Sequence, residues 1–234
     1  MAVFTIADLH LSNSTNKPMD IFGPKWENHA ERLRENWQNL VRPEDTVIIA
    51  GDVSWGMRTG DALSDLEFIQ SLNGKKIIAK GNHDYWWQTM KKLYEVRDSI
   101  SATSIDFLFN NAYKVENFII CGTRGWFPEA NYSPEDEKIV NREAERLRTS
   151  ILQGLKLKEE NPDCEMLVFL HYPPAYGSVR CERICEVLHE YKIKRVFYGH
   201  LHGAQKSKLV YQIAGAELHL VSADWINFTP VEIK

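Results

Sequence analysis

The chain has 234 residues, of which 44% are hydrophobic and 26% are charged, and its formal net charge is -4. This length fits one large α/β domain over residues 1–234, because no Pro/Gly/Ser-rich or like-charged stretch predicts a linker. The negative charge gives no general attraction to a phosphate backbone, so extended nucleic-acid binding is not expected. No stretch of eighteen apolar residues predicts a membrane span.

The N-terminus and the cysteines indicate the compartment. The first residues lack a basic start, and Asp8 interrupts the apolar run too early for a secretory signal. The four cysteines are scattered without a C-x-x-C pair. Cys181 and Cys185 would share one helix face and could bind metal, although packing into a core is the commoner role. We expect a cytoplasmic protein with reduced, mostly buried thiols.

Short β-branched runs alternate with amphipathic stretches along the chain. Buried strands are predicted at residues 3–7, 46–50, 76–79, 166–170 and 195–198. Helices are predicted at residues 27–41 and 61–72, and a long third helix begins with the capping sequence Ser133-Pro134-Glu135-Asp136. Its apolar positions keep steps of three or four: Val140, Ala144, Leu147, Ile151 and Leu155. Alternation and turn residues predict hairpins within residues 107–122 and 209–233. The pattern predicts mixed sheets, packed together with helices outside.

Metal-binding side chains follow each of the five predicted strands. In chain order these side chains are Asp8, His10, Asp52, Asn82, His83, Asp84, His171, His200 and His202. In open α/β sheets the ligand crevice lies at the carboxyl ends of the strands, so residues from distant strands can meet there. In an extended segment the two ends of D-x-H and of H-x-H share one face. The other three histidines fall in predicted helices or a hairpin and receive no role: His29, His189 and His219.

The ligand types select among metals. Carboxylate, carboxamide and imidazole groups without thiolate suit Mn, Fe, Zn or Co rather than copper or an iron–sulfur cluster. Seven such ligands are too many for one ion. They suit two ions about 3.5 to 4 Å apart that share a carboxylate and a water-derived hydroxide. These residues therefore predict a dinuclear hydrolytic centre.

The five segments together resemble the calcineurin-like metallophosphoesterase superfamily, whose pattern is D-x-H, G-D, G-N-H-D/E, a later H and G-H-x-H in this order. The match extends from Asp8 to His202, and five ordered motifs are far more specific than any one alone. The resemblance implies a four-layer α/β/β/α sandwich with two mixed β-sheets flanked by helices. It also implies a metal-dependent phosphohydrolase, either a phosphatase or a phosphodiesterase.

The resemblance further implies a role for each matched residue. His83 would stay off the metals and donate a proton to the leaving oxygen or stabilise its charge. A hydroxide that bridges two divalent or trivalent ions of Mn, Fe or Zn would attack phosphorus in line, so no phosphoenzyme would form. The implied ligands are Asp8, His10 and His202 for one ion, Asn82, His171 and His200 for the other, and Asp52 as the bridge.

One position departs from the protein-phosphatase branch of this superfamily. That branch has a second acid three residues after the aspartate of G-D, and the acid orients the catalytic histidine. Here Trp55 stands at that position. The partner of His83 is therefore not identified, since Asp84 is only its neighbour in sequence, and a phosphoserine phosphatase of that branch is disfavoured. Trp55 is a candidate for lining the substrate pocket.

Two arginines and several aromatic residues lie near the predicted site. Arg58 and Arg124, each in a predicted loop, could clamp a phosphate oxygen through the planar guanidinium, although solvation at the surface is the commoner role. Aromatic rings beside a phosphate site could stack a nucleobase, although core or rim packing is commoner. The aromatic residues concerned are Trp55, Tyr85, Trp86, Trp87, Trp126 and Trp225.

We expect hydrolysis of a phosphate mono- or diester, with a small phosphorylated metabolite or nucleotide as the substrate. One alternative is a nuclease-type phosphodiesterase of the same superfamily, which ought to have a basic path for DNA or an added binding domain. Another is a non-catalytic binding scaffold of this fold, as in a retromer subunit that resembles the family but lacks the acid histidine. His83 is present in this chain.

Overall fold

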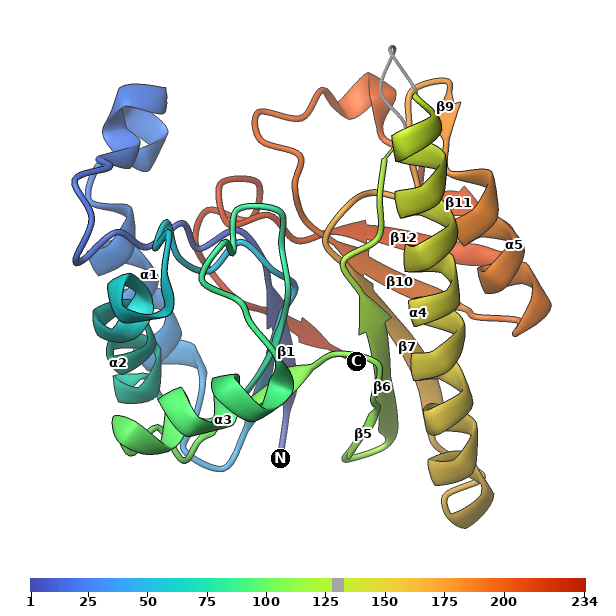
Figure 1. The fold of residues 1–234 in the computed structure, drawn as a ribbon, viewed down its shortest axis with the longest axis horizontal. Coiled ribbons are helices and arrows are strands. Elements are labelled where there is room, and N and C mark those ends of the chain that lie inside the picture. The colour runs from blue at the N-terminus through green and yellow to red at the C-terminus, as the bar shows by residue number, and fades with distance from the viewer. Residues whose placement is uncertain (128–132) are drawn as a thin grey trace.

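The computed structural model describes residues 1–127 and 133–234, and it contains two large β-sheets with helices outside them (Figure 1). The first sheet has five strands in the order β13-β1-β2-β3-β4. In that order their bounds are Val231–Ile233, Val3–Ile6, Thr46–Ile49, Lys75–Ala79 and Ile105–Leu108. β1 to β4 are parallel to one another, whereas β13 pairs antiparallel with β1.

The second sheet has six strands in the order β11-β12-β10-β7-β6-β5. In that order their bounds are Gln212–Ile213, Ala216–Leu220, Arg195–Tyr198, Glu165–Leu170, Phe118–Thr123 and Tyr113–Val115. The four inner strands are parallel, and each outer strand is antiparallel to its neighbour. Two short strands, β8 (Ala175–Tyr176) and β9 (Val179–Arg180), form a separate pair.

Helices cover the outer face of each sheet. In Figure 1, α1 (His29–Leu40), α2 (Leu63–Ser71) and α3 (Met90–Ser99) lie on the side of the first sheet, and α4 (Pro134–Glu160) and α5 (Glu182–Glu190) lie on the side of the second. Short 3-10 helices occur in the connections: η1 (Met19–Phe22), η2 (Pro24–Trp26), η3 (Thr59–Ala62) and η4 (Lys206–Lys208). The expected four-layer α/β/β/α arrangement is confirmed.

Apolar side chains fill the three spaces between these four layers. Along β1, Phe4 and Ile6 pack on the helix side, whereas Val3 packs between the two sheets. Phe169 of β7 and Phe197 of β10 stack in the same central layer, with ring centroids 5.2 Å apart. Because both faces of the parallel strands are buried, these strands are nearly continuous apolar runs in the sequence. The five predicted strands are all present, with ends that differ by one residue at most.

Each of the two predicted hairpin regions contains one hairpin, but neither is a hairpin throughout. β5 and β6 form a hairpin with its turn at Glu116-Asn117. β4 instead pairs parallel with β3, so residues Asn110-Asn111 connect the two sheets. β11 and β12 likewise form a hairpin, whereas β13 crosses to the first sheet. The prediction of hairpins alone was therefore wrong at β4 and β13, because alternation within a strand does not specify its partner.

The long helix α4 begins as predicted but packs differently near its end. The side chain of Ser133 accepts a hydrogen bond from the backbone N–H of Asp136, and the Asp136 carboxylate accepts one from the backbone N–H of Ser133, which completes a capping box. Four of the five predicted apolar positions are buried, but Leu155 is 37% exposed. Gly154 lies against β6 instead, where a Cβ atom would overlap the Sγ atom of Cys121.

Helix α3 was not predicted. Its N-terminus is capped by Thr89, whose side chain accepts a hydrogen bond from the backbone N–H of Lys92, but only Leu93 is fully buried among its ten residues. The weak apolar pattern explains why sequence periodicity did not reveal it. All four cysteines are buried and free, as expected. Among the described residues, no helix combines the length and apolar character needed to cross a membrane.

Candidate metal centre

The predicted ligands lie on loops at the carboxyl ends of strands from both sheets. β1, β2 and β3 lead into Asp8, Asp52 and Asn82, and β7 and β10 of the second sheet lead into His171 and His200. Hydrogen bonds join these loops. The N–H of Asp8 donates to the carbonyl of Gly51 at 2.9 Å, and the Nδ1–H of His171 donates to the carbonyl of Ala50 at 3.1 Å. Residues from strands far apart in sequence are therefore held together.

The backbone at these strand ends has unusual conformations. Asp8, His10, Asp52 and His200 all have positive φ angles, of 61°, 46°, 54° and 71°. Such conformations cost on the order of 1 kcal/mol or more for residues other than glycine, and four of them gather at this one place. The glycines of the motifs permit close packing of the loops. A Cβ atom on Gly81 would overlap the carboxylate of Asp52, and one on Gly199 would overlap that of Asp8.

Three predicted ligands form a first group at the cavity side of the centre. Asp8, His10 and His202 place one ligand atom each within 4.8 Å of one another. The Nε2 atoms of His10 and His202 lie 3.1 Å apart, and the Oδ1 atom of Asp8 lies 3.7 Å from Nε2 of His202. Asp8 and His10 are fully buried, whereas the side chain of His202 is 36% exposed at the rim.

A second group lies deeper between the sheets. Asp8, Asp52 and His171 form another set of ligand atoms within 4.8 Å of one another. The Oδ2 atom of Asp52 lies 3.3 Å from Nε2 of His171 and 3.7 Å from Nε2 of His10, so it faces both groups. The Oδ1 atom of Asn82 lies 2.6 Å from Nε2 of His171 and 3.0 Å from Nδ1 of His200. All seven predicted ligands are thus brought together.

The arrangement of lone pairs fits metal ions. The Oδ1 atom of Asp8 and the Oδ2 atom of Asp52 are buried without a hydrogen-bond partner among the described residues. Because His171 donates its Nδ1–H to a carbonyl, its neutral form would present an Nε2 lone pair to the Asn82 oxygen, another acceptor. Facing acceptors and unpaired carboxylate oxygens need cations between them. Oxygen and imidazole donors without thiolate suit transition-metal ions.

The electrostatics of the centre also favour bound positive charge. Burial lowers the pKa of His171, but the carboxylate of Asp52 outweighs burial and raises that pKa to about 9. Burial likewise raises the pKa of Asp52, but the positive charge of His171 brings it below its ordinary value. Burial lowers the pKa of His200 to about 3, which keeps this imidazole neutral. A neutral imidazole beside charged carboxylates is the form in which such residues bind a metal.

His83 is close to these groups but has a different environment. Its backbone N–H donates to the Oδ1 atom of Asp52 at 2.7 Å. Its ring lies against Trp55, with centroids 4.4 Å apart, and Trp55 also stacks on the ring of His10 at 4.8 Å. The Nδ1 atom of His83 is buried and has no hydrogen-bond partner among the described residues. Contact with Trp55 and the bond to Asp52 thus hold His83 in the absence of a second acid.

Asp84 links the two loops that contain Asp52 and His83. Its carboxylate accepts backbone hydrogen bonds from Gly81, Asp52, Val53 and Ser54, and a further one from the indole N–H of Trp86, at distances from 2.7 to 3.3 Å. Burial raises the pKa of Asp84 to about 6. Asp84 therefore positions the backbone of both loops.

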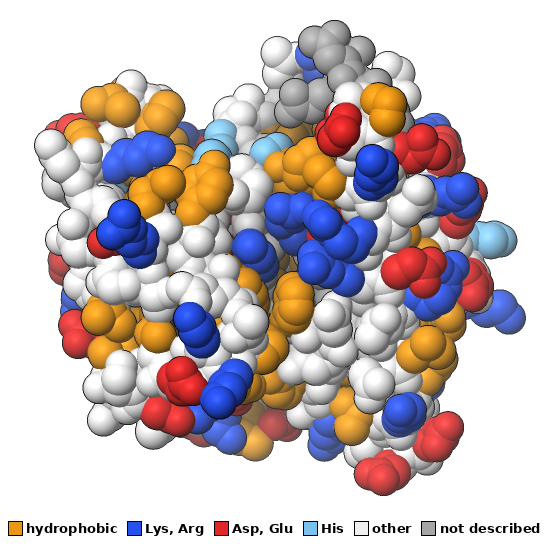
Figure 2. Space-filling model, in the orientation of Figure 1, with side chains coloured by type: hydrophobic (Ala, Val, Ile, Leu, Met, Phe, Trp, Pro, Cys, Tyr) orange, Lys and Arg blue, Asp and Glu red, His pale blue; other side chains and the backbone are white. Residues whose placement is uncertain are grey.

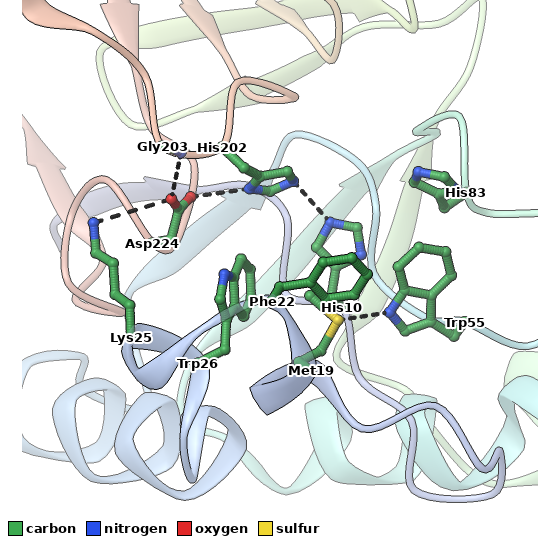
Figure 3. A pocket seen from close by; sticks show the side chains of 10 residues that line it. All are labelled: His10, Met19, Phe22, Lys25, Trp26, Trp55, His83, His202, Gly203 and Asp224. Carbon is green, nitrogen blue, oxygen red and sulfur yellow. Dashed lines mark hydrogen bonds and ion pairs between the residues drawn. The ribbon is translucent and has the colours of Figure 1, made fainter.

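A cavity of about 380 Å³ opens beside His10, His83 and His202 (Figure 3). Its wall includes Trp55, the candidate named above, and the apolar side chains of η1 and η2. The lining residues are His10, Met19, Phe22, Lys25, Trp26, Trp55, His83, His202, Gly203 and Asp224. A mostly apolar cavity beside convergent polar groups is the usual form of a small-molecule site.

Comparisons with known proteins agree with this geometry. The family model described as calcineurin-like phosphoesterase matches residues 1–204. This chain belongs to the calcineurin-like phosphoesterase family. Membership and the cluster of Asp and His side chains together support a metal-dependent phosphoesterase. Gene 66 protein of Mycobacterium phage L5 is 32% identical over 78 residues, which are 33% of this chain and 37% of that relative. The chain thus spans little more than a third of that relative's length.

Solved structures of low sequence identity share the fold. TT1561 of Thermus thermophilus superposes with a TM-score of 0.55 at 8% identity and covers 99% of this chain and 97% of its own. Phosphopantetheinyl hydrolase from Mycobacterium tuberculosis gives a TM-score of 0.53 at 16% identity, over 99% of this chain and 95% of its own. At these identities the likeness supports the fold alone.

Asp224 is a residue of this calcineurin-like site that the motifs did not reveal. Its Oδ1 atom accepts a hydrogen bond from Nδ1–H of His202 at 3.0 Å, and its Oδ2 atom accepts one from the N–H of Gly203 at 3.0 Å. This bond leaves the Nε2 lone pair of His202 directed at His10. Asp224 lies four residues after the end of β12, inside the region 209–233 where hairpins were predicted, and no sequence motif marked it.

The two arginines differ in where they lie. Arg124 follows β6, and its backbone carbonyl accepts hydrogen bonds from the N–H groups of His171 and Tyr172, which places it beside the centre. Arg58 is exposed at the start of η3 and is not among the residues that line the cavity. Of the aromatic candidates, Trp86 and Trp87 are buried in the core, whereas Tyr85 is 55% exposed.

We expect Asp52→Asn to lose metal as well as rate, because the substitution removes the negative charge that faces both ligand groups. Elemental analysis after dialysis should find less metal per chain than in the wild type. Asp163→Asn, the same change at an exposed turn after α4, should retain it. Full metal content and normal turnover in Asp52→Asn would contradict a bridging role.

We expect Asp224→Ala to weaken metal binding by about 10- to 100-fold, the typical effect of removing a carboxylate that orients a ligating histidine. Isothermal titration calorimetry of the metal-depleted protein with Mn²⁺ measures this affinity directly. Asp20→Ala removes an exposed carboxylate from η1 and serves as the control. Equal Mn²⁺ affinity in Asp224→Ala and the wild type would show that His202 needs no such support.

Proposed function

We propose that this chain is a dinuclear metal-dependent phosphoesterase that acts on a small phosphorylated molecule. The observation that supports two ions is the position of Asp52. Its unpartnered Oδ2 atom lies 3.7 Å from the His10 nitrogen of one ligand group and 3.3 Å from the His171 nitrogen of the other. Bridging carboxylates of this kind hold two ions about 3.5 to 4 Å apart. Mn, Fe and Zn are the ions that this donor set favours.

In this proposal the ligands fall into the two sets that surround Asp52. Bound ions would supply an activated water and would neutralise the phosphate oxygens. Asp8 and Asp52 offer the negative charge that retains the ions, and Asp224 fixes the orientation of His202. The ligand sets are Asp8, His10 and His202 for one ion, Asn82, His171 and His200 for the other, and Asp52 for both.

His83 is the proposed proton donor to the leaving oxygen. It lines the cavity without belonging to either ligand group, its ring lies against Trp55, and its backbone N–H is bonded to Asp52. Burial lowers its pKa, whereas the carboxylate of Asp52 raises it. A bound phosphate ester would add negative charge beside the ring and would thereby favour the protonated form, which is the form that donates.

The size and walls of the cavity favour a small organic leaving group. Its volume of about 380 Å³ is at the lower end for small-molecule sites, and Met19, Phe22, Trp26 and Trp55 make its walls apolar and aromatic. The ammonium of Lys17 lies over the Trp55 ring, 3.1 Å from its centroid. These walls suit a compact, partly apolar or planar group attached to the phosphate.

The decisive assay compares p-nitrophenyl phosphate with bis-p-nitrophenyl phosphate. We expect purified protein to hydrolyse at least one of them, to lose that activity when a chelator removes the metal, and to regain it on addition of Mn²⁺. Elemental analysis of the reconstituted protein should give two ions per chain. Absence of hydrolysis with a fully loaded centre would favour a binding scaffold, and a single tightly bound ion would contradict the dinuclear proposal.

We expect His83→Asn to retain both ions but to lose about 10²- to 10⁴-fold in rate on alkyl phosphates, the usual contribution of a positioned general acid. With p-nitrophenyl phosphate the loss should be smaller, because p-nitrophenolate leaves without a proton. Rates across a series of aryl and alkyl phosphates measure this dependence.

His189→Asn, which changes an exposed histidine at the end of α5, is the matched control and should keep every rate. Loss of metal in His83→Asn would show that His83 is a ligand. An equal loss of rate for all leaving groups would show that it binds substrate rather than donating a proton.

A further inference from the structure

A cluster of basic side chains lies beside the metal centre, on the face shown in Figure 2. The figure shows Lys and Arg side chains gathered in the hollow between the two halves of the molecule, close to histidine side chains. The cluster consists of Arg142 and Arg146 on α4, Arg124 after β6 and Lys80 after β3. We call these four residues the basic cluster. It stands out because the chain as a whole has a net charge of -4.

One buried carboxylate holds the arginines of the basic cluster. Glu143 is fully buried, and its Oε1 atom lies 2.7 Å from Arg146, 3.6 Å from Arg124 and 4.0 Å from Arg142. Its Oε2 atom accepts a hydrogen bond from the hydroxyl of Thr123 at 2.7 Å. A buried carboxylate needs one cation as a partner, and Arg146 meets that need. The remaining positive charge is therefore not required to hold Glu143.

The positive charge of the cluster exceeds the acids near it. Among the described residues, Glu143 is the only acidic group within 4.0 Å of Arg124 or Arg142. Lys80 interacts electrostatically with Arg124 and Arg146, and the acids that act on it are Asp84 and Glu143. These four cations therefore have two carboxylates near them, Glu143 and Asp84. This surplus of positive charge is unfavourable unless an anion binds to it.

Arg124 is held in place and still has an unused donor. Its guanidinium lies over the ring of Trp126, 5.1 Å from the centroid, and the indole N–H of Trp126 donates to Asp136 at 3.1 Å. The side chain is only 18% exposed. Its Nε atom is buried without a hydrogen-bond partner among the described residues. A fixed guanidinium with a free N–H is preorganised to bind an oxyanion.

The cluster adjoins the ligands of the second group. The backbone carbonyl of Arg124 accepts the N–H of His171 at 3.0 Å. Lys80 is two residues before Asn82, so their Cα atoms lie within about 7 Å of each other. The backbone at Arg124 and at Lys80 therefore lies next to two ligands of the second group, His171 and Asn82.

We propose that the basic cluster binds a second phosphate group of the substrate, remote from the phosphate that is cleaved. This inference rests on the proposed function and makes it more specific, because the substrate becomes a small molecule with two phosphate groups. The planar guanidinium forks of Arg124 and Arg142 match phosphate oxygens in pairs, and Lys80 adds a point charge on the side of Asn82.

The test measures binding rather than turnover. Isothermal titration of the metal-loaded protein with butane-diphosphonate and with butylphosphonate compares ligands with and without a second phosphonate, and neither can be hydrolysed. We expect the diphosphonate to bind about 10- to 100-fold more tightly, the factor typical of added charge-assisted hydrogen bonds. In Arg124→Gln and Arg142→Gln this ratio should fall toward one. The side chain of Arg142 is 55% exposed, so its replacement leaves the packing of α4 intact.

Arg148→Gln is the matched control, because it makes the same change on α4 where the arginine pairs with Glu145 and Glu190. It should keep the wild-type ratio. Equal affinity for both phosphonates in the wild type would overturn the proposal, and so would an unchanged ratio in the two cluster variants. If a butylphosphonate that carries a terminal carboxylate binds as tightly as the diphosphonate, the cluster does not select phosphate over other anions, and the proposal of a phosphate site is overturned. These binding results are distinct from a failure of the proposed function, which would appear as the absence of p-nitrophenyl phosphate hydrolysis.

Discussion

The centre depends on the burial of two carboxylates side by side. Asp8 and Asp52 are almost completely buried, and each has an oxygen without a hydrogen-bond partner among the described residues. Burial and the charge of Asp52 both raise the pKa of Asp8, while the positive charge of His171 opposes them. Two such charges in a medium of low dielectric constant are stable only with cations between them. Burial keeps His10 and His200 neutral, so among these histidines only His171 and His202, whose pKa values are raised, add positive charge beside the carboxylates.

This need for converging ligand atoms explains the conformation of the loops around the centre. For the ligand atoms to converge, loops from two sheets must approach within hydrogen-bond distance, which the glycines of the motifs permit because they have no Cβ atom. Asp84 then ties two of these loops together through their backbone N–H groups. The positive φ angles at Asp8, Asp52 and His200 are compatible with a rigid framework that holds the ligands before any ion binds.

Sequence alone predicted the features that are local in the chain. The strands were recognised because both of their faces are buried, and the ligands were recognised because each follows a strand. Partners that depend on tertiary packing could not be predicted. Asp224 reaches His202 only because the segment after β12 returns to the centre, and β13 leaves its hairpin region to join β1. Arg124 was a candidate phosphate ligand in the sequence, but its grouping with Arg142 and Arg146 around Glu143 could not be predicted, because Arg124 and the two α4 arginines come together only in the fold.

The motifs supply the ligands of the centre, whereas segments outside them contribute to the cavity and to the basic cluster. The motif residues from Asp8 to His202 lie within residues 1–204, the part of the chain that matches the family, and in the proposed function they surround the cleaved phosphate. Four of the ten residues that line the cavity come from η1 and η2, which occupy the connection between β1 and α1, and two of the four residues of the basic cluster come from α4. These two features lie beside different ligands, the cavity beside His10 and His202 and the cluster beside His171 and Asn82. A substrate that used both would extend from an apolar pocket, past the ions, to a second anion site. Specificity would then reside in the connections between shared strands, which can change in length and composition without disturbing the buried carboxylates.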